Sequence, residues 1–226
     1  MKILALDTAT EACSAALLID GSIRERFEIA PRAHARLLLP MLDDLLKEAG
    51  LAPAQLDAIA FGRGPGSFTG VRIAASVAQG IAFAADLPVL PVSTLAALAW
   101  PVLRDGADRV FAAIDARMGE IYWAAYAGSA QNGLEALSEE QVTSAAVVCV
   151  PAGDAWQGVG SGWAVYADVL RPHFGACLLG FDATALPHAA DIAGLAALDF
   201  AQGRAVTAEQ ALPVYLRNQV VQTQRR

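Results

Sequence analysis

Two stretches far apart in this chain follow the same plan. Leu4–Leu17 has the sequence LALDTATEACSAAL, and Ala112–Tyr126 has the sequence AAIDARMGEIYWAAY. In each, an apolar run ends in an aspartate (Asp7 or Asp115), a short polar turn follows, and a second apolar run begins. Short apolar runs bounded by turn residues are typical of buried strands. The repetition therefore predicts a duplicated chain whose halves share an antiparallel strand pair.

The pattern around the first copy predicts a longer order of elements. Three strands come first, the second and third joined by a hairpin turn at Asp20-Gly21, and helices then alternate with strands. The predicted strands are 2–6, 12–19, 22–29, 56–61 and 88–92, and the predicted helices are 33–49, 71–85 and 93–100. Pro40 is expected to kink the first helix or to mark its effective start. The order β-β-β-α-β-α-β-α is that of an α/β half of the actin-like (RNase H-like) fold.

The second copy starts a less regular half. After a strand at 110–114 and another at 121–127, the pattern weakens to segments at 147–150 and 158–166, a helix at 189–201, and a last short strand or turn at 213–217. We therefore predict two tandem β-β-β-α-β-α type halves, residues 1–103 and a reduced half at 104–226.

Charge and composition exclude several classes of protein. The formal net charge is −7, and no lysine- or arginine-rich run precedes the terminal Arg225–Arg226 pair, which disfavours unaided binding to tRNA. The three cysteines and three histidines are scattered without zinc-site spacing, so no metal site is expected. The longest weakly polar stretch, 73–85, contains Ser76, Gln79 and Gly80 and falls short of a membrane span. We expect a cytoplasmic protein without membrane association.

The first strand end and the glycine-rich loop allow two interpretations. Asp7 and Thr8 could hold magnesium and phosphate, or their side chains could bond the local backbone of a turn. The loop 64–70 precedes a helix, and Gly64, Gly66, Ser67 and Thr69 could contact a phosphate or nucleotide. The same loop could be a tight strand-to-helix turn capped by Ser67 or Thr69, since it lacks the P-loop lysine and the GxGxxG spacing.

Other enzyme chemistries find little support. A nuclease of the RNase H type needs several converging carboxylates, but the strand that ends at Phe61 is followed by Gly-Arg-Gly. A serine hydrolase needs a G-x-S-x-G elbow, which Gly66-Ser67-Phe68 does not provide.

Apolar stripes on the first two predicted helices are either core or interface. The first helix offers a leucine-rich stripe, and the second offers small residues that would let another helix approach closely. We expect a partner to contact Leu37, Leu38, Met41, Leu45, Val71, Arg72, Ala75 and Ala78. The alternative is that all of these apolar residues belong to the core.

Several motifs together resemble the TsaB (YeaZ-like) family. They are ILALDTAT (3–10), GRGPGSFTGVR (62–72), PVSTLAAL (91–98) and AAIDARMGEIYWAAY (112–126), with HARLLLPML (34–42) and the tail PVYLR in support. The similarity covers about residues 1–127 and the tail. It implies an actin-like fold and a subunit needed to make threonylcarbamoyladenosine in tRNA.

The resemblance also implies partners. A family member pairs through its N-terminal helices with TsaD, the threonylcarbamoyl-transferring subunit; TsaE, an ATPase, joins them, and the isolated protein forms homodimers through the same surface. Binding to tRNA would occur only through that complex. TsaD-type proteins hold a metal with a histidine pair on the first helix, where this chain has only His34. We therefore expect a non-catalytic subunit without a cofactor, in which Arg72 positions the glycine-rich loop or meets a carboxylate across the interface. The alternatives are an ATP-dependent phosphotransferase or ATPase that uses Asp7 and the loop, and a protease.

Overall fold

The first half of the chain forms a five-stranded sheet in a computed structural model that describes residues 1–130 and 132–217. Residue 131 and residues 218–226, including the Arg225–Arg226 pair, lie outside the described part. The strands are β1 (Lys2–Asp7), β2 (Ala12–Ile19), β3 (Ser22–Ile29), β4 (Ala58–Gly62) and β5 (Val89–Val92). Their order is β3-β2-β1-β4-β5; β3, β2 and β1 are antiparallel, whereas β4 and β5 run parallel to β1.

The second half repeats this topology. Its strands are β6 (Arg109–Arg117), β7 (Glu120–Ser129), β8 (Gly133–Ala136), β9 (Gln141–Ser144), β10 (Trp156–Val159) and β11 (Leu178–Asp182). The order is β11-β10-β6-β7-β8, with β9 also paired to β7. As in the first sheet, an antiparallel meander is followed by two parallel strands on the other side of the first strand. The structure confirms the duplication predicted from the two Asp-containing stretches.

In the described part of the chain, five helices accompany the sheets: α1 (His34–Ala49), α2 (Phe68–Ala85), α3 (Thr94–Arg104), α4 (Ser161–Phe174) and α5 (Ala189–Ala201). Short 3-10 turns lie at Pro53–Gln55, Ala145–Val147, Gly175–Cys177 and Ala208–Gln210. The second half is reduced at one point, because the turn Ala145–Val147 stands where the first half has α1. α1 is continuous, with Pro40 inside it.

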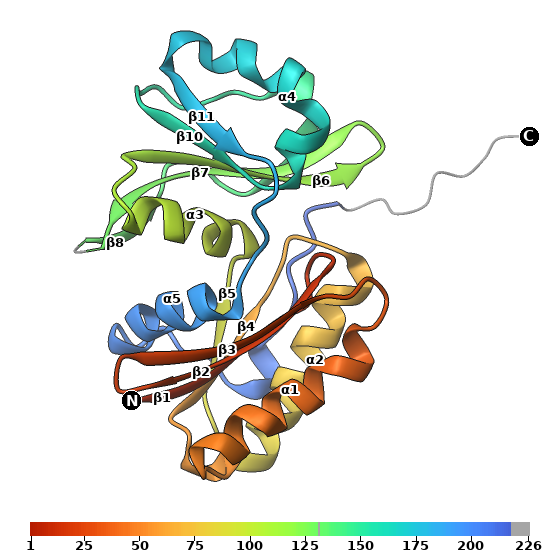
Figure 1. Cartoon of the computed structure of the whole chain (residues 1–226), viewed down its shortest axis with the longest axis vertical. Coiled ribbons are helices and arrows are strands. Elements are labelled where there is room, and N and C mark those ends of the chain that lie inside the picture. The colour runs from red at the N-terminus through yellow and green to blue at the C-terminus, as the bar shows by residue number, and fades with distance from the viewer. Residues whose placement is uncertain (131, 218–226) are drawn as a thin grey trace, which may run out of the picture.

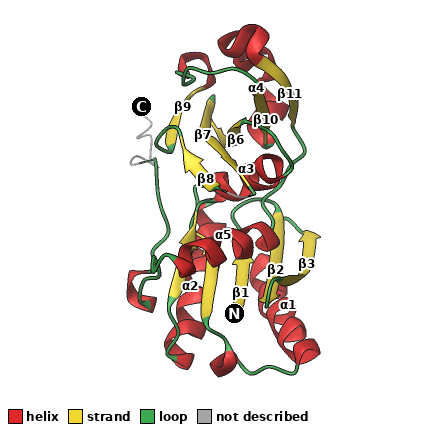
Figure 2. Cartoon of the chain, turned by 90° about the vertical axis from the view of Figure 1, so that its left-hand side faces the viewer, coloured by secondary structure: helices red, strands yellow, loops and turns green. Residues whose placement is uncertain are grey.

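The elements stack in five layers (Figure 1), with α1 and α2 on one outer face and α4 on the other. The last helix of each half packs on the sheet of the other half: α3 lies against β6 and β7, and α5 lies against β1 and β2. Figure 2 shows both helices between the two sheets. One continuous apolar core therefore joins the sheets, with Ile3 and Ala16 from the first, Val110 and Ala124 from the second, and both helices.

This exchange of helices changes the predicted division of the chain. The boundary between residues 103 and 104 follows the repeat in the sequence, but the packing does not follow it. Residues 189–211, predicted as part of the second half, pack on the first sheet, and Val206 forms a bridge to Val89 of β5. The sequence pattern also missed β8, β9, β11 and the part of α4 after residue 166, and the segment predicted at 147–150 is not a strand. The three missed strands are only four or five residues long, which is too short to show a clear periodicity.

Candidate partner-binding surface

The glycine-rich loop places the start of α2 against the turn after β1. Ser67 caps α2 by accepting a hydrogen bond from the Gly70 N–H, and the Ser67 N–H donates to the carbonyl of Ala9 at 2.7 Å. The Thr8 hydroxyl donates to the Gly70 carbonyl at 2.7 Å. A Cβ on Gly70 would lie 1.9 Å from the Thr8 carbonyl oxygen, and one on Gly66 would lie 2.5 Å from that of Ala9. The glycines are therefore needed for close backbone packing.

The predicted phosphate contacts do not form one site. Asp7 and Thr8 are fully buried, and the backbone of Gly64 packs beside Val214. Gly66 and Ser67 line a cavity of about 630 Å³ between the two sheets, whereas Thr69 faces α1 from α2. Asp7 and Thr8 are not among the residues that line that cavity. Asp7 therefore does not reach the cavity that the glycine-rich loop lines, which argues against a nucleotide held by Asp7 and the loop together.

Most of the predicted partner contacts are core residues. Side chains that follow the helical stripe turn toward the first sheet, where they pack with Leu4, Leu6 and Phe61. The buried ones, none more than 3% exposed, are Leu38, Leu45, Val71, Ala75 and Ala78. Leu45, Val71, Ala75 and Ala78 are wrong as surface contacts, because each helix has one apolar face to bury and the sheet takes it. Leu38 is equally buried but also lines a groove between α1 and α2. Leu37 and Met41 are partly buried at its edge, and Arg72 is exposed.

A second apolar face remains uncovered on α1 and α2. Leu39 is 53% exposed, Phe68 48% and Phe83 75%. A groove of about 420 Å³ lies between the two helices; its lining residues are Ala35, Leu38, Phe68, Thr69, Arg72, Ile73, Ser76 and Val77. Among the described residues, α2 alone is long and apolar enough to cross a bilayer by length and composition, yet its other face packs in the core. Apolar patches of this kind mark contact sites on protein surfaces.

Arg72 lies at the edge of this groove, next to two neighbouring aromatic rings. Its guanidinium carbon lies 3.6 Å from the centre of the Phe68 ring and 5.5 Å from that of Tyr215. Its Nε donates to the Tyr215 hydroxyl at 2.8 Å. Tyr215 belongs to the C-terminal segment, which is fixed by a hydrogen bond from the Val214 N–H to the Arg63 carbonyl at 2.8 Å. The tail motif thus contributes a side chain to the α2 surface.

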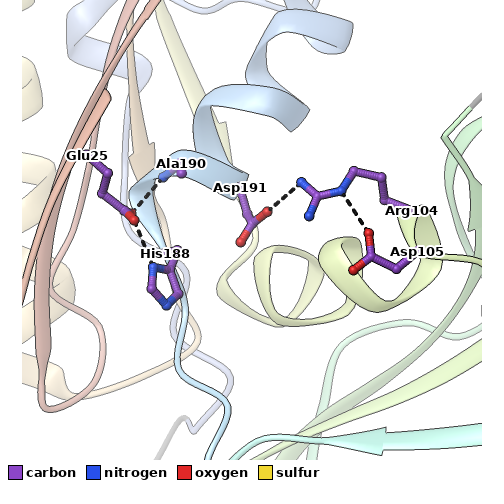
Figure 3. Close-up of polar contacts among 6 residues, drawn as sticks. All are labelled: Glu25, Arg104, Asp105, His188, Ala190 and Asp191. Carbon is purple, nitrogen blue, oxygen red and sulfur yellow. Dashed lines mark hydrogen bonds and ion pairs between the residues drawn. The ribbon is translucent and has the colours of Figure 1, made fainter. Parts of the chain in front are cut away.

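A partly buried polar cluster fixes α5 on the first sheet (Figure 3). Glu25 of β3 accepts hydrogen bonds from the Ala190 N–H at 3.0 Å and pairs with His188 Nδ1 at 2.9 Å. The hydrogen bond to Glu25 raises the pKa of His188. Arg104 of α3 lies 3.5 Å from Asp191, whose pKa burial raises to about 6. The cluster therefore ties both exchanged helices to each other and to β3.

Asp7 lies on the same face of the sheet, without any exposure to solvent. One carboxylate oxygen accepts from the Ala9 N–H at 3.0 Å, and the other has no hydrogen-bond donor among the described residues. It lies so close to β4 that a Cβ on Gly62 would come within 1.8 Å of it. Burial raises the pKa of Asp7 to about 7. No group of three or more His, Cys, Asp or Glu that could hold a metal occurs in residues 1–130 and 132–217.

Comparisons with known proteins agree with this architecture. The family model TsaD, described as tRNA N6-adenosine threonylcarbamoyltransferase, matches residues 27–221. The Escherichia coli tRNA threonylcarbamoyladenosine biosynthesis protein TsaB is 44% identical over 97% of this chain and 96% of its own length. The TsaB protein of Haemophilus influenzae is 42% identical over 97% and 95%. The chain belongs to the TsaB family.

Solved structures of TsaB-type proteins share its fold. The YeaZ structure from Pseudomonas aeruginosa has a TM-score of 0.88 and 51% identity, and covers 95% of this chain and 99% of its own. A second structure from that organism, described as similar to peptidase YEAZ, has a TM-score of 0.89 and the same identity, over 96% and 99%. Together with the two sheets and the TsaD-type family model, these neighbours show the actin-like fold. The relatives named TsaB show the family role in threonylcarbamoyladenosine biosynthesis.

In this TsaB-family chain, sequence reasoning missed the exposed members of the surface. Leu39, Phe68 and Phe83 belong to the same two helices as the stripe of buried residues but lie outside it. Large apolar residues outside the stripe were the available signal, since a helix with a single buried face would carry polar residues there. The contribution of Tyr215 had no such signal, because it depends on the path of the tail.

Proposed function

We propose that this chain is the non-catalytic scaffold and activating subunit of a tRNA threonylcarbamoyl-transferase complex, and that it pairs with a TsaD-type subunit through the exposed face of α1 and α2. The observation that carries the proposal is the uncovered apolar groove between these helices, which Phe68 lines, together with the exposed Leu39 and Phe83 on the same two helices. A single exposed leucine is common on protein surfaces, whereas an apolar surface shared by two neighbouring helices marks a contact site.

The absence of a histidine pair on α1 supports the non-catalytic assignment. His34 is the one histidine on this helix. A metal-assisted transfer that uses two histidines from this helix therefore lacks a ligand. Transfer would remain with the TsaD-type partner, tRNA would be bound only in the complex, and a TsaE-type ATPase would join the pair. The same face would hold two copies of the chain together when the partner is absent.

Size-exclusion chromatography with light scattering tests the pairing, using the TsaD-type subunit of the same organism. We expect a one-to-one complex, and we expect tRNA modification by the purified components to require this chain. Ser76→Arg should prevent pairing, because it places a charged side chain in the groove without touching the core. Val165→Arg, on the exposed face of α4, is the matched control and should pair normally.

A second pair of variants distinguishes the exposed face of α1 from its buried face. Leu45→Ala removes a fully buried side chain that does not line the groove, and it should lower the free energy of unfolding by about 2–5 kcal/mol. Leu39→Ala, on the same helix but half exposed, should leave stability within about 0.5 kcal/mol but weaken the complex. If Leu39→Ala and Ser76→Arg both pair with wild-type affinity, the TsaD-type partner does not use this face.

A further inference from the structure

The guanidinium of Arg72 is held in place before any partner arrives. The guanidinium lies over the Phe68 ring, and the Tyr215 ring lies beside Phe68, with the two ring centres 5.8 Å apart. An exposed arginine normally loses side-chain rotational entropy when it is fixed in a contact. Stacking on Phe68 and the hydrogen bond to the Tyr215 hydroxyl have already restricted this side chain.

Only one edge of the guanidinium is used inside the chain. Nε donates to Tyr215, and no acceptor for the two terminal amino groups occurs among residues 1–130 and 132–217. No carboxylate of the described chain forms an ion pair with Arg72 either; the acidic partners found for other arginines include Glu140 for Arg63 and Glu48 for Arg26. Arg72 therefore presents a rigid pair of donors to the outside, in the geometry that a carboxylate fills with two parallel hydrogen bonds.

The position of Arg72 links this donor pair to the apolar groove. Arg72 and Phe68 both line the groove, together with Ile73 and Val77. A partner helix that inserts an apolar side chain there would bring residues three or four positions away to the rim. Arginine and aromatic residues at the centre of an interface are the residue types that contribute most to binding.

We propose that Arg72 is a specificity-determining contact: it binds a carboxylate of the TsaD-type partner next to an apolar side chain that fills the α1–α2 groove. The inference rests on the proposed function, since it concerns the same surface. It adds the chemistry of the partner, an aspartate or glutamate on a helix that carries a large apolar residue one turn away. Tyr215 acts as a positioning residue, because it holds the guanidinium and does not itself need to contact the partner.

The test is the dissociation constant of the complex with the purified TsaD-type subunit, measured by calorimetry at two salt concentrations. Arg72→Gln should weaken binding by about 30-fold or more, because the partner carboxylate stays desolvated without its counter-charge. Arg72→Lys should lose about tenfold, since a point charge cannot reproduce the two parallel hydrogen bonds. Tyr215→Phe, which removes only the hydroxyl, should lose about threefold. Arg171→Gln is the matched control and should bind within twofold of wild type, because this exposed arginine also lies over an aromatic ring but belongs to α4, on the opposite outer face.

Charge exchange identifies the carboxylate. Arg72→Glu should abolish measurable binding, and one Asp→Arg or Glu→Arg substitution in the partner should restore part of it. Circular dichroism and melting temperature confirm that each variant is folded. If wild type binds but Arg72→Gln binds equally well, the inference is overturned and the proposed function stands. If wild type itself does not bind, the proposed function is the part that fails.

Discussion

Replacing Asp7 by asparagine should stabilise this protein at neutral pH. The carboxylate is fully buried, one of its oxygens has no donor among the described residues, and burial raises its pKa from 3.8 to about 7. A native-state pKa above that of the unfolded chain means that the native state keeps its proton while the unfolded state releases it. Stability therefore falls as the pH rises from about 4 to about 7, and the loss is complete above pH 7.

The size of the effect follows from the two pKa values. A difference of one pKa unit corresponds to about 1.4 kcal/mol, so the shift from 3.8 to about 7 costs roughly 4 kcal/mol at pH 8. Asparagine has the same shape and still accepts from the Ala9 N–H. It places an amide beside Gly62 that lacks an acceptor, which costs about 1–3 kcal/mol at every pH. The net gain at pH 8 should thus be about 1–3 kcal/mol.

The pH dependence of the difference is the sharper readout. Urea unfolding of both proteins, followed by tryptophan fluorescence between pH 4.5 and 8, gives the difference in unfolding free energy at each pH. We expect it to grow by several kcal/mol with rising pH, in favour of Asp7→Asn. Asp44→Asn, at an exposed site on α1, is the control and should change stability by no more than about 0.5 kcal/mol throughout. A difference for Asp7→Asn that is constant from pH 4.5 to 8 would refute the reasoning.

Two further predictions concern the elements around the site. Gly70→Ala should lower the free energy of unfolding by about 3 kcal/mol or more, and the melting temperature with it, because its Cβ would lie 1.9 Å from the Thr8 carbonyl oxygen. Gly80→Ala is the contrasting variant, since no atom lies within 4 Å of the added Cβ. It should stabilise α2 by about 0.5–1 kcal/mol in the same thermal scan. Glu25→Gln keeps an acceptor for the Ala190 N–H but removes the charge that raises the pKa of His188. Because the folded pKa of His188 is raised, the pairing stabilises below its ordinary 6.5 and is lost as the pH rises through the folded pKa. Urea unfolding should therefore show a loss of about 0.5–1 kcal/mol for Glu25→Gln at pH 6, and almost none at pH 9; equal losses at both would contradict it.

Local sequence patterns were sufficient for the repeated strands and for most helix termini, although α2 begins three residues before the predicted 71 and α3 ends four residues after the predicted 100. Alternating apolar runs, the Asp20-Gly21 turn and the cap at Ser93 each act within a few residues, so the pattern carries them. The sequence could not show which sheet receives α3 and α5, because both helices are apolar on more than one side. Their exchange is decided by packing between residues far apart, such as Ile192 against the first sheet. The surface residues of α1 were mispredicted for the same reason. Leu38 and Leu39 are the same residue type, and only the position of the first sheet decides that Leu38 is buried and Leu39 exposed.

The C-terminal segment connects the two sheets to the candidate surface. After Ala211, whose carbonyl accepts from Gln79 of α2 at 3.1 Å, the chain crosses to Tyr215 and reaches Arg217, which pairs with Glu120 of β7. The side chain that holds Arg72 therefore lies two residues from an ion pair with the second sheet. A shift of one sheet relative to the other would move Tyr215, and with it the donor pair of Arg72. The second half lies away from α1 and α2 but would then influence partner binding through this short segment. In a protein that we propose to be non-catalytic, this gives the second half of the duplicated fold a role in pairing.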